Sequence, residues 1–282
     1  MSVVSRFAPS PTGRLHLGHA FSAVRAHDLA RAGGGRFLLR IEDIDPGRSR
    51  EAFVAGIEED LAWLGLAWDG PVLRQSARLS RYAAALDRLK PRGLVYPCFC
   101  TRAEIAASAS APHGPEGPAY PGTCRRLSPE AQATRRASEP HCWRLDLRVA
   151  LAEAGGDLGW HDATAGWVAA DPAPQGDVVL ARKDAPTSYH LAVTVDDAAQ
   201  GVTDVVRGRD LFEATHVHRL LQALLGLPTP FYHHHPLLAG PDGQRLAKRT
   251  GAPSLAELRA GGADPAALVA GLRARASAAD RA

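Results

Sequence analysis

The chain has 282 residues, of which 45% are hydrophobic, and its formal net charge is only +3. This is enough apolar material for a full core and one or two domains. No apolar run approaches the ~18 residues of a membrane span, and the first residues lead straight into an expected strand, so no signal peptide is visible. Four cysteines in such a chain favour a metal site or catalysis over disulfides. We therefore expect a cytoplasmic protein with no membrane attachment, and the charge is weak evidence for a nucleic-acid partner.

The first expected unit is a strand–helix–strand arrangement over residues 6–45. A short apolar segment leads into a Pro/Gly-rich turn, and a helix is expected from His16 to the three glycines at 33–35. An apolar strand follows at 37–41. This order of elements around a glycine-containing turn is typical of nucleotide-binding proteins.

The turn in this unit has the chemistry of an anion site. Gly13 and Gly18 lack side chains, so adenine or phosphate can approach the backbone there. The free N–H groups and the positive end of the helix dipole favour an anion. His16 and His19 are three residues apart, so they share a helix face and can bind phosphate oxygens. Two such histidines alone would more often be ordinary surface residues, but the flanking elements favour the nucleotide interpretation.

Apolar spacing predicts two helices and a strand next. The first helix begins after Ser49, a possible N-cap, and runs to about residue 64. The second covers residues 78–89, and residues 94–96 form a short strand.

The following segment, 98–176, contains a possible metal site. Cys98 and Cys100 open it, and Cys124 closes a stretch rich in Pro and Gly. Zinc takes three or four thiolate or nitrogen ligands in a tetrahedron, although three cysteines can also be buried small hydrophobic residues. The residues leave a fourth ligand open among Tyr120, His113 and Cys142.

Within this segment we expect a helix at 128–137, an alternating strand at 142–147 and a loop-rich stretch at 157–176. The segment interrupts two regions with strand and helix patterns. It therefore has the character of an insertion between two halves of one nucleotide-binding sheet.

The second half predicts strands at 178–182 and 231–238, an amphipathic helix at 211–225, and short helices at 254–260 and 265–274. Three consecutive histidines occupy positions 233–235. Neighbouring side chains in a strand point to opposite faces, so these histidines cannot all converge on one metal.

The motifs together resemble the catalytic core of the class I glutamyl-tRNA synthetases. Residues 6–45 are similar to the N-terminus of that family, with His16-Leu17-Gly18-His19 as its HIGH-type signature. Residues 186–192 and 204–208 resemble two further family segments, apart from an inserted Ser188. Residues 245–251 resemble the KMSKS loop, in which Arg245 and Ala247 depart from the family pattern and Lys248 is kept. The chain has only three lysines among its 33 basic residues, so a lysine here indicates a need for a compact ammonium group.

The resemblance implies an α/β fold, a Rossmann-like parallel sheet split by a zinc-containing insertion, with a short helical C-terminal tail and no anticodon-binding domain. The expected divisions are residues 1–97 and 177–240 for the two halves of the nucleotide-binding domain, 98–176 for the insertion, and 241–282 for the KMSKS-like loop and tail.

The resemblance also implies roles for individual residues. ATP binding, with Mg, would fall to His16, Gly18, His19 and Lys248, and catalysis to His16, His19 and Lys248. Glutamate binding would fall to Arg6, Phe7, Ala8, Pro9, Ser10, Glu42, Tyr189 and Arg207. One structural zinc ion would be held by Cys98, Cys100, Tyr120 and Cys124. Tyr120 is taken as the fourth ligand because Tyr120 and Cys124 match the Tyr-x-x-x-Cys spacing of the family's zinc site. A guanidinium at position 207 suits a substrate carboxylate, because it binds such a group in a fork and so selects glutamate over glutamine.

Only about 30 residues follow the KMSKS-like loop, too few for an anticodon-binding domain. The family members that share this truncation are the glutamyl-Q tRNA(Asp) synthetases, which activate glutamate with ATP and transfer it to the queuosine base in the anticodon of tRNA(Asp). The resemblance thus implies ATP, L-glutamate and queuosine-containing tRNA(Asp) as partners, and we expect a monomer. The alternatives are a shortened glutamyl-tRNA synthetase that charges the tRNA 3′ end and a non-catalytic tRNA-binding paralogue.

Overall fold

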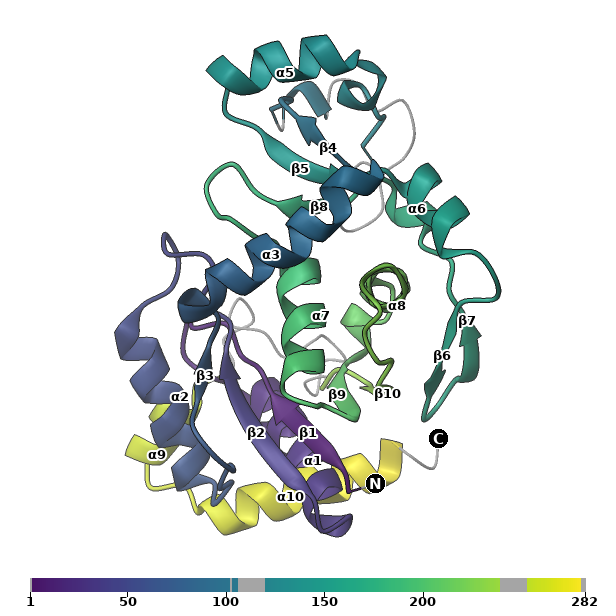
Figure 1. Cartoon of the computed structure of the whole chain (residues 1–282). Helices are drawn as coiled ribbons and strands as arrows, with labels where there is room; N and C mark the ends of the chain where they lie inside the picture. Colours follow the sequence, from purple (N-terminus) through teal and green to yellow (C-terminus); the bar gives the residue numbers. More distant parts are fainter. Residues whose placement is uncertain (1, 102, 106–119, 239–252, 280–282) are drawn as a thin grey trace.

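The computed structural model describes residues 2–101, 103–105, 120–238 and 253–279. A narrower lobe stands above a wider body (Figure 1). The elements in chain order are β1 (Val4–Phe7), α1 (Leu17–Ala32), β2 (Arg36–Ile41), α2 (Glu51–Trp63), β3 (Leu73–Arg74), α3 (Leu79–Leu89), β4 (Val95–Cys98), α5 (Pro129–Ser138), β5 (Cys142–Leu145), α6 (Leu147–Ala154), β6 (Gly159–Asp162), β7 (Gly166–Ala169), β8 (Val179–Ala181), α7 (Tyr189–Ala199), β9 (Asp204–Gly208), α8 (Ala214–Leu225), β10 (Phe231–His235), α9 (Leu255–Ala260) and α10 (Pro265–Ala279).

Parallel strands form the body. Strands β1, β2 and β3 pair in parallel in one sheet, while β10 pairs in parallel with both β9 and β6 in a second, and β7 lies antiparallel at its edge. The two sheets meet where the backbone N–H of Thr203 donates to the carbonyl of Val4 at 2.9 Å. Nucleotide-binding α/β folds place ligands at the carboxyl ends of such strands. The expected class of fold is confirmed.

The β1–α1–β2 unit forms as the sequence predicts. The side chain of His16 caps α1 at its first turn, and Phe21 and Val24 on its buried face pack against the strands. The chain leaves the helix through Gly33 and then passes so close to Val3 that a Cβ on Gly35 would overlap the Val3 carbonyl. Only glycine fits at position 35, where the chain passes from α1 into β2.

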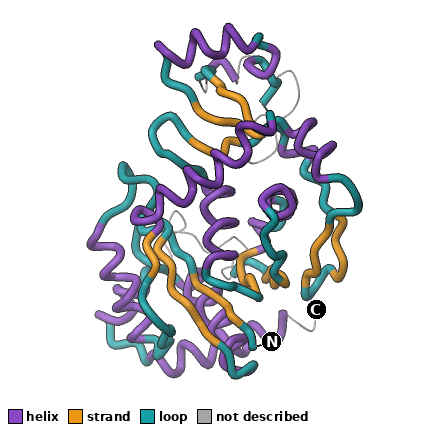
Figure 2. The backbone as a smooth tube through the Cα atoms, viewed as in Figure 1, coloured by secondary structure: helices purple, strands orange, loops and turns teal. Residues whose placement is uncertain are grey.

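The upper lobe is built on a small antiparallel sheet with the order β4-β5-β8. Helix α5 lies at its top (Figures 1 and 2). A separate buried cluster around Tyr96, Phe99 and Tyr120 packs inside this lobe. Two strands pair across the divisions expected from the sequence. Strand β8 belongs to the second half by sequence but joins β5, whereas β6 lies inside 98–176 but joins β10.

Two local expectations were wrong. Helix α2 begins at Glu51, and its N-cap is Arg50, which makes no side-chain capping bond, so Ser49 lies outside it. The stretch 157–176 contains the β6–β7 hairpin, because β6 finds its partner in β10, far along the chain. Tyr189, in the segment that resembles the family, opens helix α7.

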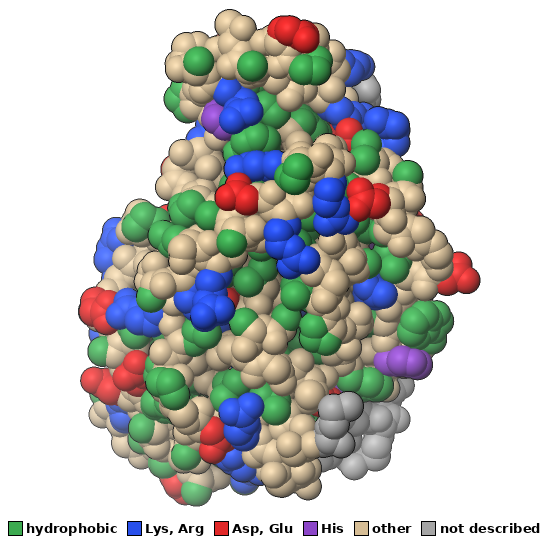
Figure 3. Space-filling model, in the orientation of Figure 1, with side chains coloured by type: hydrophobic (Ala, Val, Ile, Leu, Met, Phe, Trp, Pro, Cys, Tyr) green, Lys and Arg blue, Asp and Glu red, His purple; other side chains and the backbone are tan. Residues whose placement is uncertain are grey.

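The C-terminal helices return to the first unit. Ser254 caps α9 with Glu257 in a capping box, and the N–H of Leu255 donates to the carbonyl of Leu15, just before α1. Helix α10 then packs on α1. None of the described helices has both the length and the apolar character that crossing a membrane requires. On the face shown in Figure 3, Lys and Arg side chains are interspersed with Asp and Glu over both the lobe and the body.

Candidate functional site

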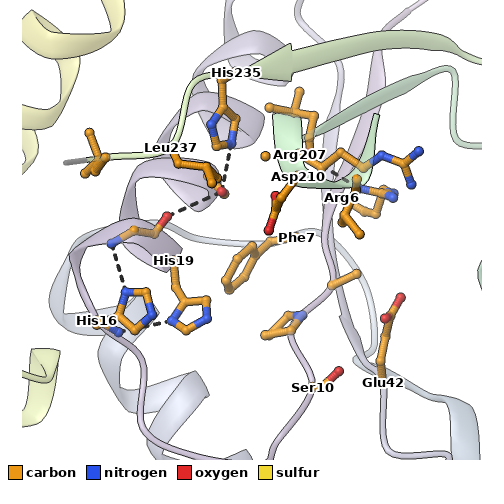
Figure 4. A pocket seen from close by; sticks show the side chains of 18 of the residues that line it. Arg6, Phe7, Ser10, His16, His19, Glu42, Arg207, Asp210, His235 and Leu237 are labelled. Carbon is orange, nitrogen blue, oxygen red and sulfur yellow. Dashed lines mark hydrogen bonds between the residues drawn. The ribbon is translucent and has the colours of Figure 1, made fainter. Parts of the chain in front are cut away.

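A pocket of about 430 Å³ lies at the carboxyl ends of β1, β9 and β10, beside the first turn of α1. Figure 4 shows His16 and His19 on one side, Glu42 on another, and Arg6 and Arg207 together on a third. The structure therefore brings together residues from four distant segments. The predicted residues that line the pocket are Arg6, Phe7, Ala8, Pro9, Ser10, His16, Gly18, His19, Glu42, Tyr189 and Arg207.

The two histidines at the start of α1 use the same ring atom to hold the turn. Nδ1 of His16 accepts the backbone N–H of Gly18 at 3.1 Å, and Nδ1 of His19 accepts the backbone N–H of His16 at 3.2 Å. The rings lie against each other with their centroids 3.8 Å apart. An imidazole whose Nδ1 accepts a hydrogen bond carries its proton on Nε2. Both rings are thus N–H donors at a helix N-terminus, a combination suited to phosphate oxygens.

Arg207 is buried at the back of the pocket and is held by neutral groups. Its Nε donates to Nε2 of His234 at 3.1 Å and its Nη2 to Oγ1 of Thr215 at 2.6 Å. Its Nη1 lies 3.3 Å from both the hydroxyl of Tyr189 and Nδ1 of His218. Within the described part of the chain, none of its hydrogen bonds or ion pairs is to a carboxylate. The guanidinium therefore keeps its attraction for an anion that enters the pocket.

Arg6 has different surroundings from those expected of a residue devoted to the ligand. Its Nε and Nη2 both donate to the carboxylate of Asp197, at 2.9 and 3.3 Å. Arg40, fully buried, donates to the same carboxylate at 2.7 Å and to Oε1 of Glu42 at 3.3 Å. Arg6 still lines the pocket, so it can act on a ligand, but it does so as part of a buried network of two arginines and two carboxylates.

The pKa values in this network differ because of burial and charge. Burial alone would raise the pKa of Asp197, but the charges of Arg6 and Arg40 outweigh it and bring the value to about 2. Burial raises the pKa of Glu42 above its usual value, although Arg40 and Arg6 oppose that shift. Glu42 would therefore gain from a cationic ligand group placed beside it. Asp197 was not singled out from the sequence, where its only signal is a pair of acidic residues within an apolar helix.

Three histidines cluster near Arg207: His218 and His234 are buried and contact it, and His190 is half-buried and contacts His218. Desolvation lowers the pKa of His190 and of His234 to about 4, and it lowers that of His218 well below 6.5, with the charge of Arg207 acting in the same direction. Nδ1 of His190 lies 3.2 Å from Nε2 of His218. All three rings are therefore neutral near pH 7, which lets His218 and His234 accept hydrogen bonds from the guanidinium of Arg207.

This cluster predicts that stability falls in mild acid. The folded-state pKa values lie below the unfolded value of about 6.5, so the unfolded state binds more protons between about pH 6.5 and 4. The free energy of unfolding should then decrease as the pH falls through that window, by up to about 1.4 kcal/mol per pH unit for each histidine that stays neutral. Urea unfolding at pH 7, 6 and 5 measures this slope. His190→Gln should make it shallower and the exposed His161→Gln should not; equal slopes in all three proteins would contradict the prediction.

The upper lobe holds the expected cysteine cluster. The sulfur atoms of Cys98, Cys100 and Cys124 all lie within 4.8 Å of one another, and those of Cys100 and Cys124 are 3.5 Å apart. Tetrahedral sulfur ligands at ~2.3 Å from an ion would be about 3.8 Å apart, so the three thiols fit a metal ion. The hydroxyl of Tyr120 is 3.5 Å from the Cys100 sulfur and accepts the backbone N–H of Cys124 at 2.8 Å.

Cys142 is the competing fourth group. It faces Cys98 across the β4–β5 pair, and a hydrogen bond from its thiol is the largest of the effects that lower the pKa of Cys98, to about 4. Burial, followed by the neighbouring cysteines, raises the pKa of Tyr120 far above its usual value. A phenolate there thus requires a cation beside it. The third candidate, His113, lies outside the described residues.

Several other predicted features also lie outside the described residues, namely Arg245, Ala247 and Lys248. The remaining lysines have ordinary contacts. Nζ of Lys183 donates to the carbonyl of Phe99 at 2.7 Å, and Nζ of Lys90 donates to Asp87 and lies over the ring of Trp143.

The three consecutive histidines have different partners, as strand geometry requires. His233 contacts Asp204, His234 contacts Arg207, and His235 lines the pocket.

Comparison with known proteins extends these observations. The family model described as "tRNA synthetases class I (E and Q), catalytic domain" matches residues 2–281. A relative from Rhodobacter capsulatus called "Glutamyl-Q tRNA(Asp) synthetase" is 53% identical over 275 residues, which cover 94% of this chain and 97% of the relative. A relative of the same name from Symbiobacterium thermophilum is 50% identical and covers 94% of this chain and 83% of itself.

Among solved structures, a glutamate tRNA ligase from Elizabethkingia meningosepticum, in complex with its amino acid, matches with a TM-score of 0.74 and 29% identity. The match covers 89% of this chain and 53% of the ligase, so the chain spans about half the length of that protein. A glutamate-tRNA synthetase from Elizabethkingia anophelis matches with a TM-score of 0.75 and the same coverage.

Proposed function

The chain belongs to the class I tRNA synthetase family of the glutamate and glutamine type, and on that premise we propose that it joins glutamate to queuosine in the anticodon of tRNA(Asp). The reaction begins with activation of glutamate by ATP. The observation that carries this proposal is the buried guanidinium of Arg207, whose described contacts include no carboxylate. It lies in the same pocket as the two histidines of α1. The site thus offers a place for an acidic amino acid beside a place for phosphate.

In the proposed first step, an oxygen of the glutamate α-carboxylate attacks the α-phosphorus of ATP, and the bond to pyrophosphate breaks. His16 and His19 donate N–H groups to the phosphates, Gly18 allows their close approach, and Mg accompanies the ATP. Lys248, outside the described residues, would bring a further positive charge. Catalysis then consists of positioning and charge stabilisation, because the histidines act as donors without giving up a proton.

The amino acid would be held by the opposite wall of the pocket. Arg207 and the hydroxyl of Tyr189 bind the side-chain carboxylate, and Glu42 binds the ammonium group. Arg6 and the backbone and side chains of residues 7–10 complete the wall. Glutamine lacks the negative charge that Arg207 attracts, so the site favours glutamate.

In the proposed second step a hydroxyl of the queuosine ring attacks the carbonyl carbon of the glutamyl-adenylate, and AMP leaves. Support for this acceptor comes from relatives that are about half identical over nearly the whole chain and carry the name "Glutamyl-Q tRNA(Asp) synthetase". A splayed-out anticodon base can enter a pocket of this kind and be recognised at its edges and by stacking. The proposed partners are therefore ATP, L-glutamate and queuosine-containing tRNA(Asp). The proposed enzyme acts as a monomer in the cytoplasm.

The test has two stages. Purified protein with Mg-ATP and glutamate should exchange labelled pyrophosphate into ATP without any tRNA. Labelled glutamate should then appear on tRNA(Asp) from cells that make queuosine, within the anticodon fragment after nuclease digestion, and not on tRNA from cells that cannot make it. Label on the terminal adenosine would instead identify a shortened glutamyl-tRNA synthetase, and the absence of exchange would identify a non-catalytic paralogue.

The proposal includes one structural zinc ion held by Cys98, Cys100, Cys124 and Tyr120. We expect Cys98→Ser to lose the zinc and to lower the melting temperature of the upper lobe, with a smaller effect on pyrophosphate exchange, because the metal would join β4 to the segment that carries Tyr120 and Cys124 within that lobe. Metal analysis by mass spectrometry measures the content. Cys142→Ser is the matched control and should retain zinc; its loss there would make Cys142 the fourth ligand in place of Tyr120.

A further inference from the structure

Arg207 contacts a series of buried side chains that are not among the residues lining the pocket. Nδ1 of His234 is 2.7 Å from Oδ2 of Asp162, and Nε2 of the same ring is 3.1 Å from Nε of Arg207. The side chains of His234 and Asp162 are each only 1% exposed. The three residues come from β10, β6 and β9, which are neighbours in one sheet, so the sheet itself aligns them.

Asp162 fixes the direction of the hydrogen bonds that link it to His234 and Arg207. Its Oδ1 accepts the backbone N–H groups of Thr164 and Ala165 at 2.9 and 3.0 Å, in the turn of the β6–β7 hairpin. Oδ2 then accepts from His234 alone, whose backbone N–H lies 3.4 Å away and whose Nδ1 lies 2.7 Å away. A carboxylate only accepts hydrogen bonds, so His234 carries its proton on Nδ1 and presents a lone pair on Nε2. This lone pair is the acceptor for the Nε–H of Arg207.

The hydrogen bonds of Asp162 and His234 affect the pocket by orienting the guanidinium of Arg207. A guanidinium group is planar, so fixing Nε against His234 and Nη2 against Thr215 determines the plane of the whole group. The hydrogen-bond partners are neutral, and the carboxylate of Asp162 stands one residue further back. The charge of Arg207 is thereby oriented without being neutralised by direct contact, which is what recognition of a substrate carboxylate requires.

We propose that Asp162 is a positioning residue for glutamate recognition. By fixing the tautomer of His234 it fixes Arg207, and so it sets the preference of the pocket for glutamate over glutamine. The inference rests on the proposed function, in which Arg207 binds the side-chain carboxylate. It assigns a role in that site to a residue of the hairpin, a segment whose sequence is uninformative.

Asp162→Asn tests the proposal with almost no change of shape. The two backbone N–H groups of the turn retain the amide oxygen in the place of Oδ1, so the amide NH₂ takes the place of Oδ2. It then donates to Nδ1 of His234, which moves the ring proton to Nε2, against the Nε–H of Arg207. We expect the KM for glutamate in pyrophosphate exchange to rise about 10- to 100-fold, the scale of one lost hydrogen bond to a charged group. The KM for ATP should stay the same, and the preference for glutamate over glutamine should fall.

Two further measurements separate positioning from a merely structural role. Long-range ¹H–¹⁵N spectra of histidine-labelled protein report the tautomer of His234 directly, and we expect it to change in Asp162→Asn. Adding His234→Gln to that variant supplies an amide oxygen to Arg207 whatever residue 162 is, so we expect the double variant to recover most of the affinity for glutamate. Asp157→Asn, an exposed change just before the same hairpin, is the matched control and should behave as the wild type.

The outcomes are distinct. A wild-type protein without glutamate-dependent exchange contradicts the proposed function. An active wild type with Asp162→Asn unchanged in the KM for glutamate overturns the inference alone, as does an unchanged tautomer. If Asp162→Asn does not fold, as judged by circular dichroism, His234→Leu takes its place. That variant removes the acceptor for Arg207, and an unaltered KM for glutamate in it also overturns the inference.

Discussion

Replacing Arg207 with Met should lower kcat/KM for glutamate in pyrophosphate exchange by about 10²- to 10³-fold, since truncating one partner of a buried charge pair costs roughly 2–5 kcal/mol. Methionine fills much of the same volume without the charge. The KM for ATP should change little, because the phosphates are expected near His16 and His19 on the other side of the pocket. Steady-state exchange with each substrate varied in turn separates the two effects.

Two variants make this result specific. Arg209→Met removes an exposed arginine two residues away, and should leave the exchange rate unchanged. Arg207→Lys keeps the charge but loses the fork and the bonds to His234 and Thr215, so it should recover only part of the activity. An Arg207→Met protein that activates glutamate as the wild type does would remove Arg207 from the proposed site.

Local sequence signals predicted the first unit of the fold well. The turn before His16, the apolar face of α1 and the glycine run after it act over a few residues, and the structure keeps all of them. The same holds for α3, α8 and the cysteine cluster, where the spacing along the chain nearly determines the contacts. The resemblance to the family, and not local chemistry, indicated which residues would line the pocket. Arg6, Phe7 and Arg207 meet there because β1 and β9 end at the same edge.

Long-range pairing is what the sequence did not reveal. Strand β6 is short and follows a glycine-rich turn, and nothing within it indicates that it will lie beside β10, some seventy positions along the chain. Asp162 gains its surroundings only from that pairing. Asp197 likewise lies in a helix, and its partners Arg6 and Arg40 come from strands more than 150 positions away. A sequence motif identifies the residues that contact a ligand. It does not readily identify the residues that hold those contacting residues in place.

Removing the charge of Asp197 should have the largest effect on stability. We expect Asp197→Asn to lower the free energy of unfolding by about 3–5 kcal/mol, since the change leaves two buried guanidinium groups without their shared carboxylate. Chemical denaturation followed by circular dichroism measures it. Asp184→Asn, which breaks an exposed pair with Arg182, is the control and should change the same quantity by under about 1 kcal/mol.

The loss should also reach the pocket, through Glu42. Arg40 contacts both Asp197 and Glu42, so without Asp197 its charge has only Glu42 as a carboxylate partner among the described contacts. Glu42 would then be less available for a substrate ammonium, and the KM for glutamate should rise in Asp197→Asn even where the protein remains folded. Adding Arg40→Met removes the competing cation and should restore part of both stability and affinity. A double variant no better than Asp197→Asn in either measurement would show that Asp197 supports the site through Arg6 alone.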